Sequence, residues 1–185
     1  MIYLINFQSL IAELCLSSLL NFTTSLKGLN MKKELNTITT IEQLKGEHDL
    51  VLTLCSRIRK GLHHNIKTQR IRNYVEWFRA QYLEPHFELE KKYIFPILGN
   101  NVRVKRALAY HRRIIRLLTC SCEDIKVLNL LEEELATLIR FEERTLYHRI
   151  NQVATPSMLQ ELQQHFIRIP YNDDNWKDQF WNEES

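Results

Sequence analysis

The chain has 185 residues, with 25 basic and 22 acidic side chains, and its formal net charge at neutral pH is +3. Charges so nearly balanced argue against a protein that binds nucleic acid or an anionic membrane, because such a protein needs a basic face. The 4 glycines and 4 prolines are too few for the turns of an all-β fold, and no two glycines lie close enough for a phosphate-binding loop. The 4 cysteines include no C-x-x-C pair, which favours a reduced, cytoplasmic protein. We therefore expect one domain of long helices with short flanking segments.

Residues 1–30 are predicted to form an extension in front of that domain. The segment 2–20 is apolar but interrupted by polar residues, and its first basic side chain comes only at Lys27. It therefore matches neither a membrane span nor a signal peptide. One interpretation is a translation start assigned too far upstream, because Met31 begins an ordinary cytoplasmic start. The alternative is a membrane or partner anchor.

Four amphipathic helices follow. A capping-box pattern at Thr40 begins the first, and Thr68 is expected to cap the second, which Pro85 should kink. On the second helix, steps of three and four residues place Tyr82 and Tyr93 on the inner face. The helices are predicted to begin near residues 40, 68, 102 and 124. Because the connections are short, neighbouring helices should be antiparallel, giving an all-α, up-down-up-down four-helix bundle.

Five polar residues interrupt the apolar inner faces of these helices, and they come from all four: His48, His86, Glu90, His111 and Glu142. A rise of about 1.5 Å per residue places all five between about 10 and 18 Å along the bundle, in one layer. A buried carboxylate without a partner costs several kcal/mol, and no Lys or Arg lies on these faces. Imidazoles and carboxylates in a bundle core are typical of non-haem iron or manganese sites. The layer therefore predicts a metal centre.

The second and fourth helices align as an internal repeat. His86-Phe-Glu-Leu-Glu90 aligns with Leu138-Ile-Arg-Phe-Glu142, and Phe95-Pro96 aligns with Tyr147-His148. Over about residues 40–152 the chain resembles the hemerythrin-like HHE cation-binding domain, whose pattern is a histidine, H-x-x-x-E, a histidine and H-x-x-x-E on successive helices. The resemblance implies a bundle of the hemerythrin type over residues 31–153, followed at 154–185 by a short C-terminal helix and an acidic, aromatic tail.

The resemblance also implies a carboxylate-bridged di-iron centre. The implied ligands are His48 and His86 on one iron, His111 and position 138 on the other, and Glu90 and Glu142 as bridges. Leu138 stands where the family has a histidine, so we expect one firmly bound iron and a second iron that is weakly bound or absent. His148 and Glu134 lie too far along the helix axis from Glu142 to replace the missing ligand.

The resemblance implies binding of a small diatomic ligand (O2 or NO), iron or oxygen sensing, or iron handling, rather than turnover of an organic substrate. No nucleic-acid or membrane partner is expected, and a protein partner is unknown. A different hypothesis is a metal-free, degenerate bundle that acts as a protein-interaction module, which Leu138 favours. A third is an oxidase or peroxidase that uses the same iron.

The tail leaves two interpretations open. Its aromatic residues, Trp176, Phe180 and Trp181, either pack back over the bundle or capture a partner.

Overall fold

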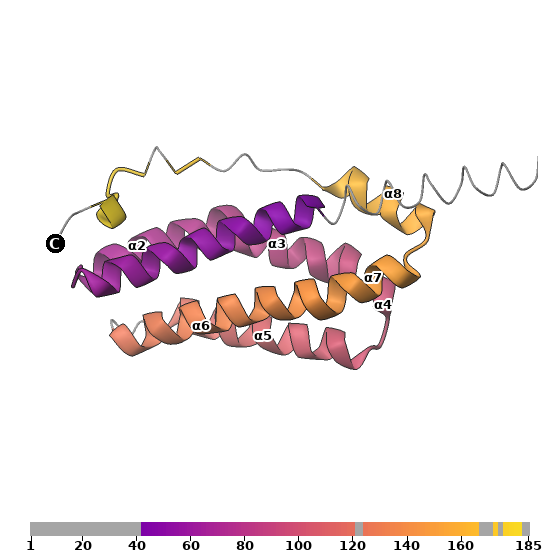
Figure 1. Cartoon of the computed structure of the whole chain (residues 1–185), viewed down its shortest axis with the longest axis horizontal. Helices are drawn as coiled ribbons and strands as arrows, with labels where there is room; N and C mark the ends of the chain where they lie inside the picture. Colours follow the sequence, from indigo (N-terminus) through magenta and orange to yellow (C-terminus); the bar gives the residue numbers. More distant parts are fainter. Residues whose placement is uncertain (1–41, 121–123, 167–171, 174–175, 183–185) are drawn as a thin grey trace, which may run out of the picture.

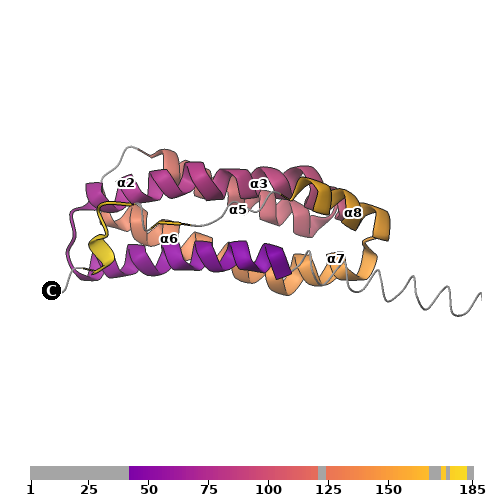
Figure 2. The same ribbon diagram turned by 90° about the horizontal axis from the view of Figure 1, so that it is seen from above.

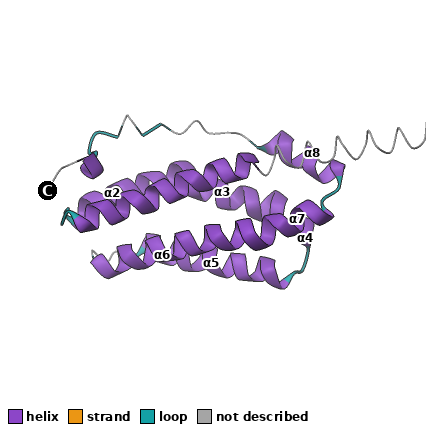
Figure 3. Cartoon of the chain, in the orientation of Figure 1, coloured by secondary structure: helices purple, strands orange, loops and turns teal. Residues whose placement is uncertain are grey.

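The computed structural model describes residues 42–120, 124–166, 172–173 and 176–182 (Figure 1). The extension at 1–30 and the capping box at Thr40 lie outside these ranges. Within them every regular element is a helix and none is a strand (Figure 3). No helix in the described part of the chain is long and apolar enough to cross a membrane.

Four helical rods lie side by side along the long axis of the molecule (Figures 1 and 2). The first rod covers residues 42–63. The second consists of α2 (Thr68–Phe78), the π-helical segment η1 (Arg79–Leu83), α3 (Glu84–Leu89), the π-helical segment η2 (Glu90–Ile94) and α4 (Phe95–Leu98). The third is α5 (Val102–Thr119), and the fourth consists of α6 (Ile125–Phe141), the π-helical segment η3 (Glu142–Tyr147) and α7 (His148–Val153). The short helix α8 (Pro156–His165) and a 3₁₀ turn, η4 (Phe180–Asn182), follow. The predicted all-α, four-helix bundle is confirmed.

Side chains cap the third and fourth rods. Asn101 accepts a hydrogen bond from the backbone N–H of Arg103, and Asp124 accepts one from that of Lys126, at 2.9 and 2.8 Å. The predicted cap at Thr68 was wrong, because Lys67 holds the cap position and Thr68 is already the first helical residue. The turn after the first rod extends to Lys67, whose carbonyl accepts the backbone N–H of Arg70.

The π-helical segments change which residues face the core. A π turn contains about one residue more than an α turn, so each segment moves the inner face by one position. Leu83 and Ile94 are buried, whereas the predicted inner residues Tyr82 and Tyr93 are only half-buried. The interruption expected at Pro85 takes the form of η1, which ends two residues before the proline.

The polar layer lies between two apolar clusters. One cluster includes Val51, Phe87, Ile114 and Leu138, and the other includes Leu44, Ile94, Ala107 and Leu146. On the first rod, His48 lies between Leu44 of one cluster and Val51 of the other. Glu90, His111 and Glu142 are flanked in the same way on the other three rods. The layer therefore has apolar packing above and below it.

The described part of the tail packs on the bundle. Phe180 is fully buried in the same cluster as the α2 side chains Ile71 and Tyr74. Arg70 donates to the carboxylate of Asp178 through its Nε at 2.9 Å. These contacts agree with the interpretation in which the tail aromatics cover the bundle.

Candidate metal centre

The five predicted residues meet in one buried layer. His48, Glu90 and Glu142 have no exposed surface, and His86 and His111 are 5% and 7% exposed. Ligand atoms of His48, His86, Glu90 and Glu142 all lie within 4.8 Å of one another, as a metal site requires.

The three Nε2 atoms converge on the two carboxylates. Nε2 of His111 lies 3.3 Å from Oε2 of Glu90 and 3.3 Å from Oε1 of Glu142. Nε2 of His48 lies 3.5 Å from the other oxygen of Glu142, Oε2. Nε2 of His86 lies 3.7 Å from Oε2 of Glu90. The two oxygens of Glu142 therefore face different histidines, which is the arrangement of a bridging carboxylate.

Three buried atoms in this layer have no hydrogen-bond partner: Nε2 of His86, Oε2 of Glu90 and Oε2 of Glu142. An unsatisfied buried polar atom costs about 1–3 kcal/mol, and more when the group is charged. In the described part of the chain, histidines alone form ion pairs with Glu90 and Glu142. The donor set therefore fits a cation, which would satisfy all three atoms at once.

Protons supply the compensating charge when no cation is bound. Burial opposes the charged form of His48, but the interactions with the carboxylates of Glu142 and Glu143 outweigh it and raise the pKa to about 9. In His111, burial is likewise outweighed by the interactions with the carboxylates of Glu142 and Glu90, and the pKa rises to about 9. Burial would raise the pKa of Glu90, but the neighbouring histidines, His86 first, lower it to about 2.

Two outer carboxylates orient the imidazoles. Nδ1 of His48 donates to Glu143 at 3.1 Å, and Nδ1 of His86 donates to Glu47 at 2.6 Å. Each bond turns the Nε2 atom of its ring toward the centre, which is the usual support of a metal-binding histidine. The bond from His48 also lowers the pKa of Glu143 below its ordinary range.

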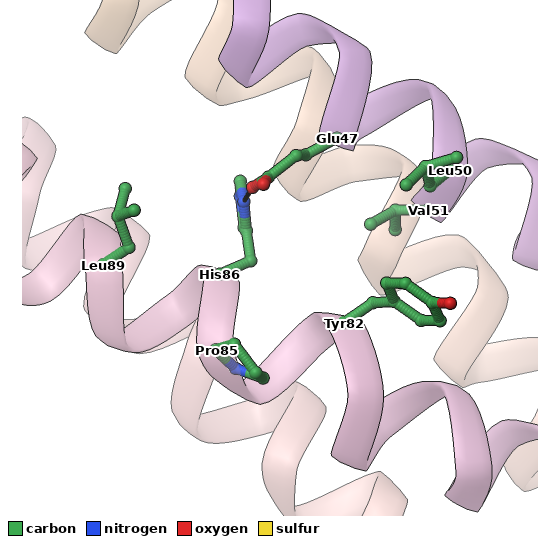
Figure 4. A pocket seen from close by; sticks show the side chains of 7 residues that line it. All are labelled: Glu47, Leu50, Val51, Tyr82, Pro85, His86 and Leu89. Carbon is green, nitrogen blue, oxygen red and sulfur yellow. Dashed lines mark hydrogen bonds and ion pairs between the residues drawn. The ribbon is translucent and has the colours of Figure 1, made fainter. Parts of the chain in front are cut away.

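Glu47 and His86 also line a small surface pocket between the first rod and α3. Figure 4 shows the two side chains pointing toward one another there, with Pro85 on the helix beside them. Sequence reasoning missed both outer carboxylates. Glu47 directly precedes His48 and Glu143 directly follows Glu142, and this adjacency is the only signal of them in the sequence.

Tyr147 is a further member of the layer that the sequence did not assign to the site. Its side chain is 1% exposed, and its hydroxyl donates to Oε1 of Glu90 at 3.0 Å. The phenolic oxygen of Tyr147 also lies 3.0 Å from Nε2 of His48, and the rings of Tyr147 and His48 stack at 5.1 Å between centroids. Burial and the charges of Glu90 and Glu142 raise the pKa of this phenol well above 10.

A regular α-helix would turn Tyr147 about 140° away from Glu142, which lies five residues earlier. The π-helical segment η3 begins at Glu142 and ends at Tyr147, and its wider turn brings the two side chains to one face. The one sequence signal was the internal repeat, which aligns Tyr147 with Phe95.

Leu138 contributes no ligand. It is fully buried in an apolar cluster, one turn before Glu142. His148 is exposed and contacts Gln152, and Glu134 accepts hydrogen bonds from Arg113 at 3.0 and 3.1 Å. Neither residue replaces the histidine ligand that is missing at position 138.

The fold and the site define a class of protein: an antiparallel four-helix bundle with a buried His/Glu cluster that can hold a metal ion. The model of the hemerythrin HHE cation binding domain family matches residues 39–120. Over this segment the chain is therefore similar to that family. The match includes His48, His86, Glu90 and His111 and ends before the fourth rod. No curated protein and no solved structure matches the chain.

Proposed function

We propose that the protein binds non-haem iron in this layer and uses it for O2 or NO binding, for sensing, or for iron handling. The proposed ligands are His48, His86, Glu90, His111 and Glu142. The observation that carries the proposal is the set of three buried ligand atoms among them that make no hydrogen bond. Iron suits a mixed set of imidazole and carboxylate ligands.

The chain's own residues prepare the site for a cation. Glu47 and Glu143 hold the imidazoles of His86 and His48 so that each Nε2 faces inward. The apolar clusters above and below the layer limit the entry of water. Bound iron would supply an open coordination position for a small ligand, so the role requires no organic substrate.

Leu138 makes the two halves of the site unequal. Family resemblance places a histidine ligand of the second iron at this position, and a buried leucine replaces it here. We therefore propose one firmly bound iron and a second that is weak or absent. A cytoplasmic location and the absence of a nucleic-acid or membrane partner stay predictions.

The test is the iron content per chain after anaerobic reconstitution with ferrous iron. We expect about one iron in the wild type and about two in Leu138→His. Leu135→His is the matched control, because Leu135 is equally buried on the same helix but two turns from Glu142. It should leave the iron content at the wild-type value.

Two irons in the wild type would contradict the unequal site. No iron in the wild type or in Leu138→His would contradict the whole proposal. That result would favour the second candidate, a metal-free interaction module, which the apolar side chain at position 138 supports.

A further inference from the structure

The hydroxyl of Tyr147 points into the candidate metal centre and lies between two of its ligand atoms. Oε1 of Glu90 and Nε2 of His48 are each 3.0 Å from the phenolic oxygen. Nδ1 of His48 is occupied by Glu143, so Nε2 is the nitrogen that faces the centre. The phenol therefore contacts two atoms through which this layer would hold a cation.

These separations suit three ligands of a single ion. Metal–nitrogen and metal–oxygen bonds are about 2.0–2.2 Å long, so two ligands at right angles around one ion are about 3 Å apart. Oε2 of Glu142 also lies near this nitrogen, 3.5 Å from Nε2 of His48. The phenolic oxygen thus lies at the separation of neighbouring ligands from both an imidazole nitrogen and a carboxylate oxygen.

Packing alone does not account for the hydroxyl. The internal repeat aligns Tyr147, whose ring stacks on that of His48 at 5.1 Å between centroids, with Phe95, whose ring lies tilted beside that of His111 at 5.5 Å. Phe95 is 3% exposed and fills its place without an oxygen atom. The two covering rings therefore differ in the one atom that reaches the ligand layer.

We propose that Tyr147 is a metal ligand, and that its phenolate oxygen binds the ferric ion held by His48. When the ion binds to both His48 and Tyr147, it replaces two protons, one on the phenol and one on Nε2 of His48, and both protons leave to the solvent. Tyrosine oxygen is a known ligand of iron in proteins. The inference rests on the proposed function, since it names a further ligand of the same centre.

The test loads the full chain with ferric citrate, so that no oxidant is needed, and removes unbound iron before measurement. Ferric phenolate complexes have a charge-transfer absorption band in the visible range. We expect this band in the wild type, with phenolate ring vibrations in the resonance Raman spectrum that shift when the tyrosine rings are deuterated. Both signals should be lost completely in Tyr147→Phe.

The matched control is Tyr110→Phe, which also removes a buried phenol. Tyr110 is 7% exposed, and its hydroxyl contacts Arg106 at 3.2 Å, away from the ligand layer. This variant should keep the band and its Raman vibrations. If Tyr147→Phe loses its iron as well, the wild-type Raman spectrum still tests whether a phenolate binds the ion.

Iron bound to the wild type without a phenolate band would overturn the inference and leave the proposed function intact. A band of unchanged intensity in Tyr147→Phe, or its loss in Tyr110→Phe, would also overturn it. Absence of bound iron in the wild type would overturn the proposed function and this inference together.

Discussion

Raising the pH should destabilise the metal-free protein over a range in which most proteins change little. His48 and His111 have pKa values of about 9 in the folded protein, against an ordinary value of 6.5. A raised pKa contributes stability that is fully present below the unfolded value and is lost as the pH rises through the folded value. The loss should therefore begin near pH 6.5 and be almost complete near pH 9.

The magnitude follows from the pKa difference. Each pKa unit corresponds to about 1.4 kcal/mol, so one histidine contributes roughly 3 kcal/mol. His48 and His111 share Glu142 and Glu90 as partners, so their contributions overlap and the total lies between about 3 and 7 kcal/mol. For a chain of this size, a loss of about 3 kcal/mol lowers the melting temperature by roughly 6–12 °C.

The assay is urea or thermal unfolding in the presence of a strong chelator, at intervals between pH 6 and 9. The scan ends at pH 9 because the pKa of the buried Cys55 thiol, raised to about 12 by burial and by Glu132, adds a separate loss above that pH. Glu142→Gln is the informative variant, since it removes a partner of both histidines and should flatten the profile. A wild-type stability that is constant or rises over this range would refute the reasoning.

Two further predictions concern the surroundings of the centre. Glu143→Gln should weaken iron binding about 10–100-fold, because the carboxylate that orients His48 is lost. Competition with a coloured chelator measures the affinity for iron, and Glu133→Gln, at an exposed position, is the control. An affinity equal to that of the wild type would contradict the orienting role of Glu143. Phe180→Ala should lower the free energy of unfolding by about 3–5 kcal/mol without changing the iron content, because it leaves a cavity in place of a fully buried ring. An unchanged urea midpoint would show that the tail does not stabilise the bundle.

The sequence was sufficient to place the five ligand candidates in one layer. The rise of a helix is constant and the connections are short, so counting residues from the turns places His48 and His111 at the same depth as Glu90. The cap at Thr68 failed for a local reason, since nothing in the sequence shows that the preceding turn extends to Lys67. Local turn geometry of this kind shifts a helix end by one or two residues.

Tyr147 escaped prediction because the reasoning assumed one helical period throughout. The π-helical segments interrupt that period, and each moves the inner face by one position. Leu83 and Ile94 are buried for the same reason, in place of Tyr82 and Tyr93. The outer carboxylates Glu47 and Glu143 act across helices, and periodicity along a single helix carries no information about such pairs.

The fourth rod differs from the second at the two positions that matter most to the centre. The repeat aligns Leu138 with His86, which removes a nitrogen ligand, and Tyr147 with Phe95, which adds an oxygen within reach of Glu90. On our proposals the polar atoms of the fourth rod that face the ions are oxygens alone, from a carboxylate and a phenolate. Such hard, anionic ligands stabilise ferric over ferrous iron. The centre would then be unequal in oxidation state as well as in occupancy, with the ion beside His48 the more firmly held in its ferric form.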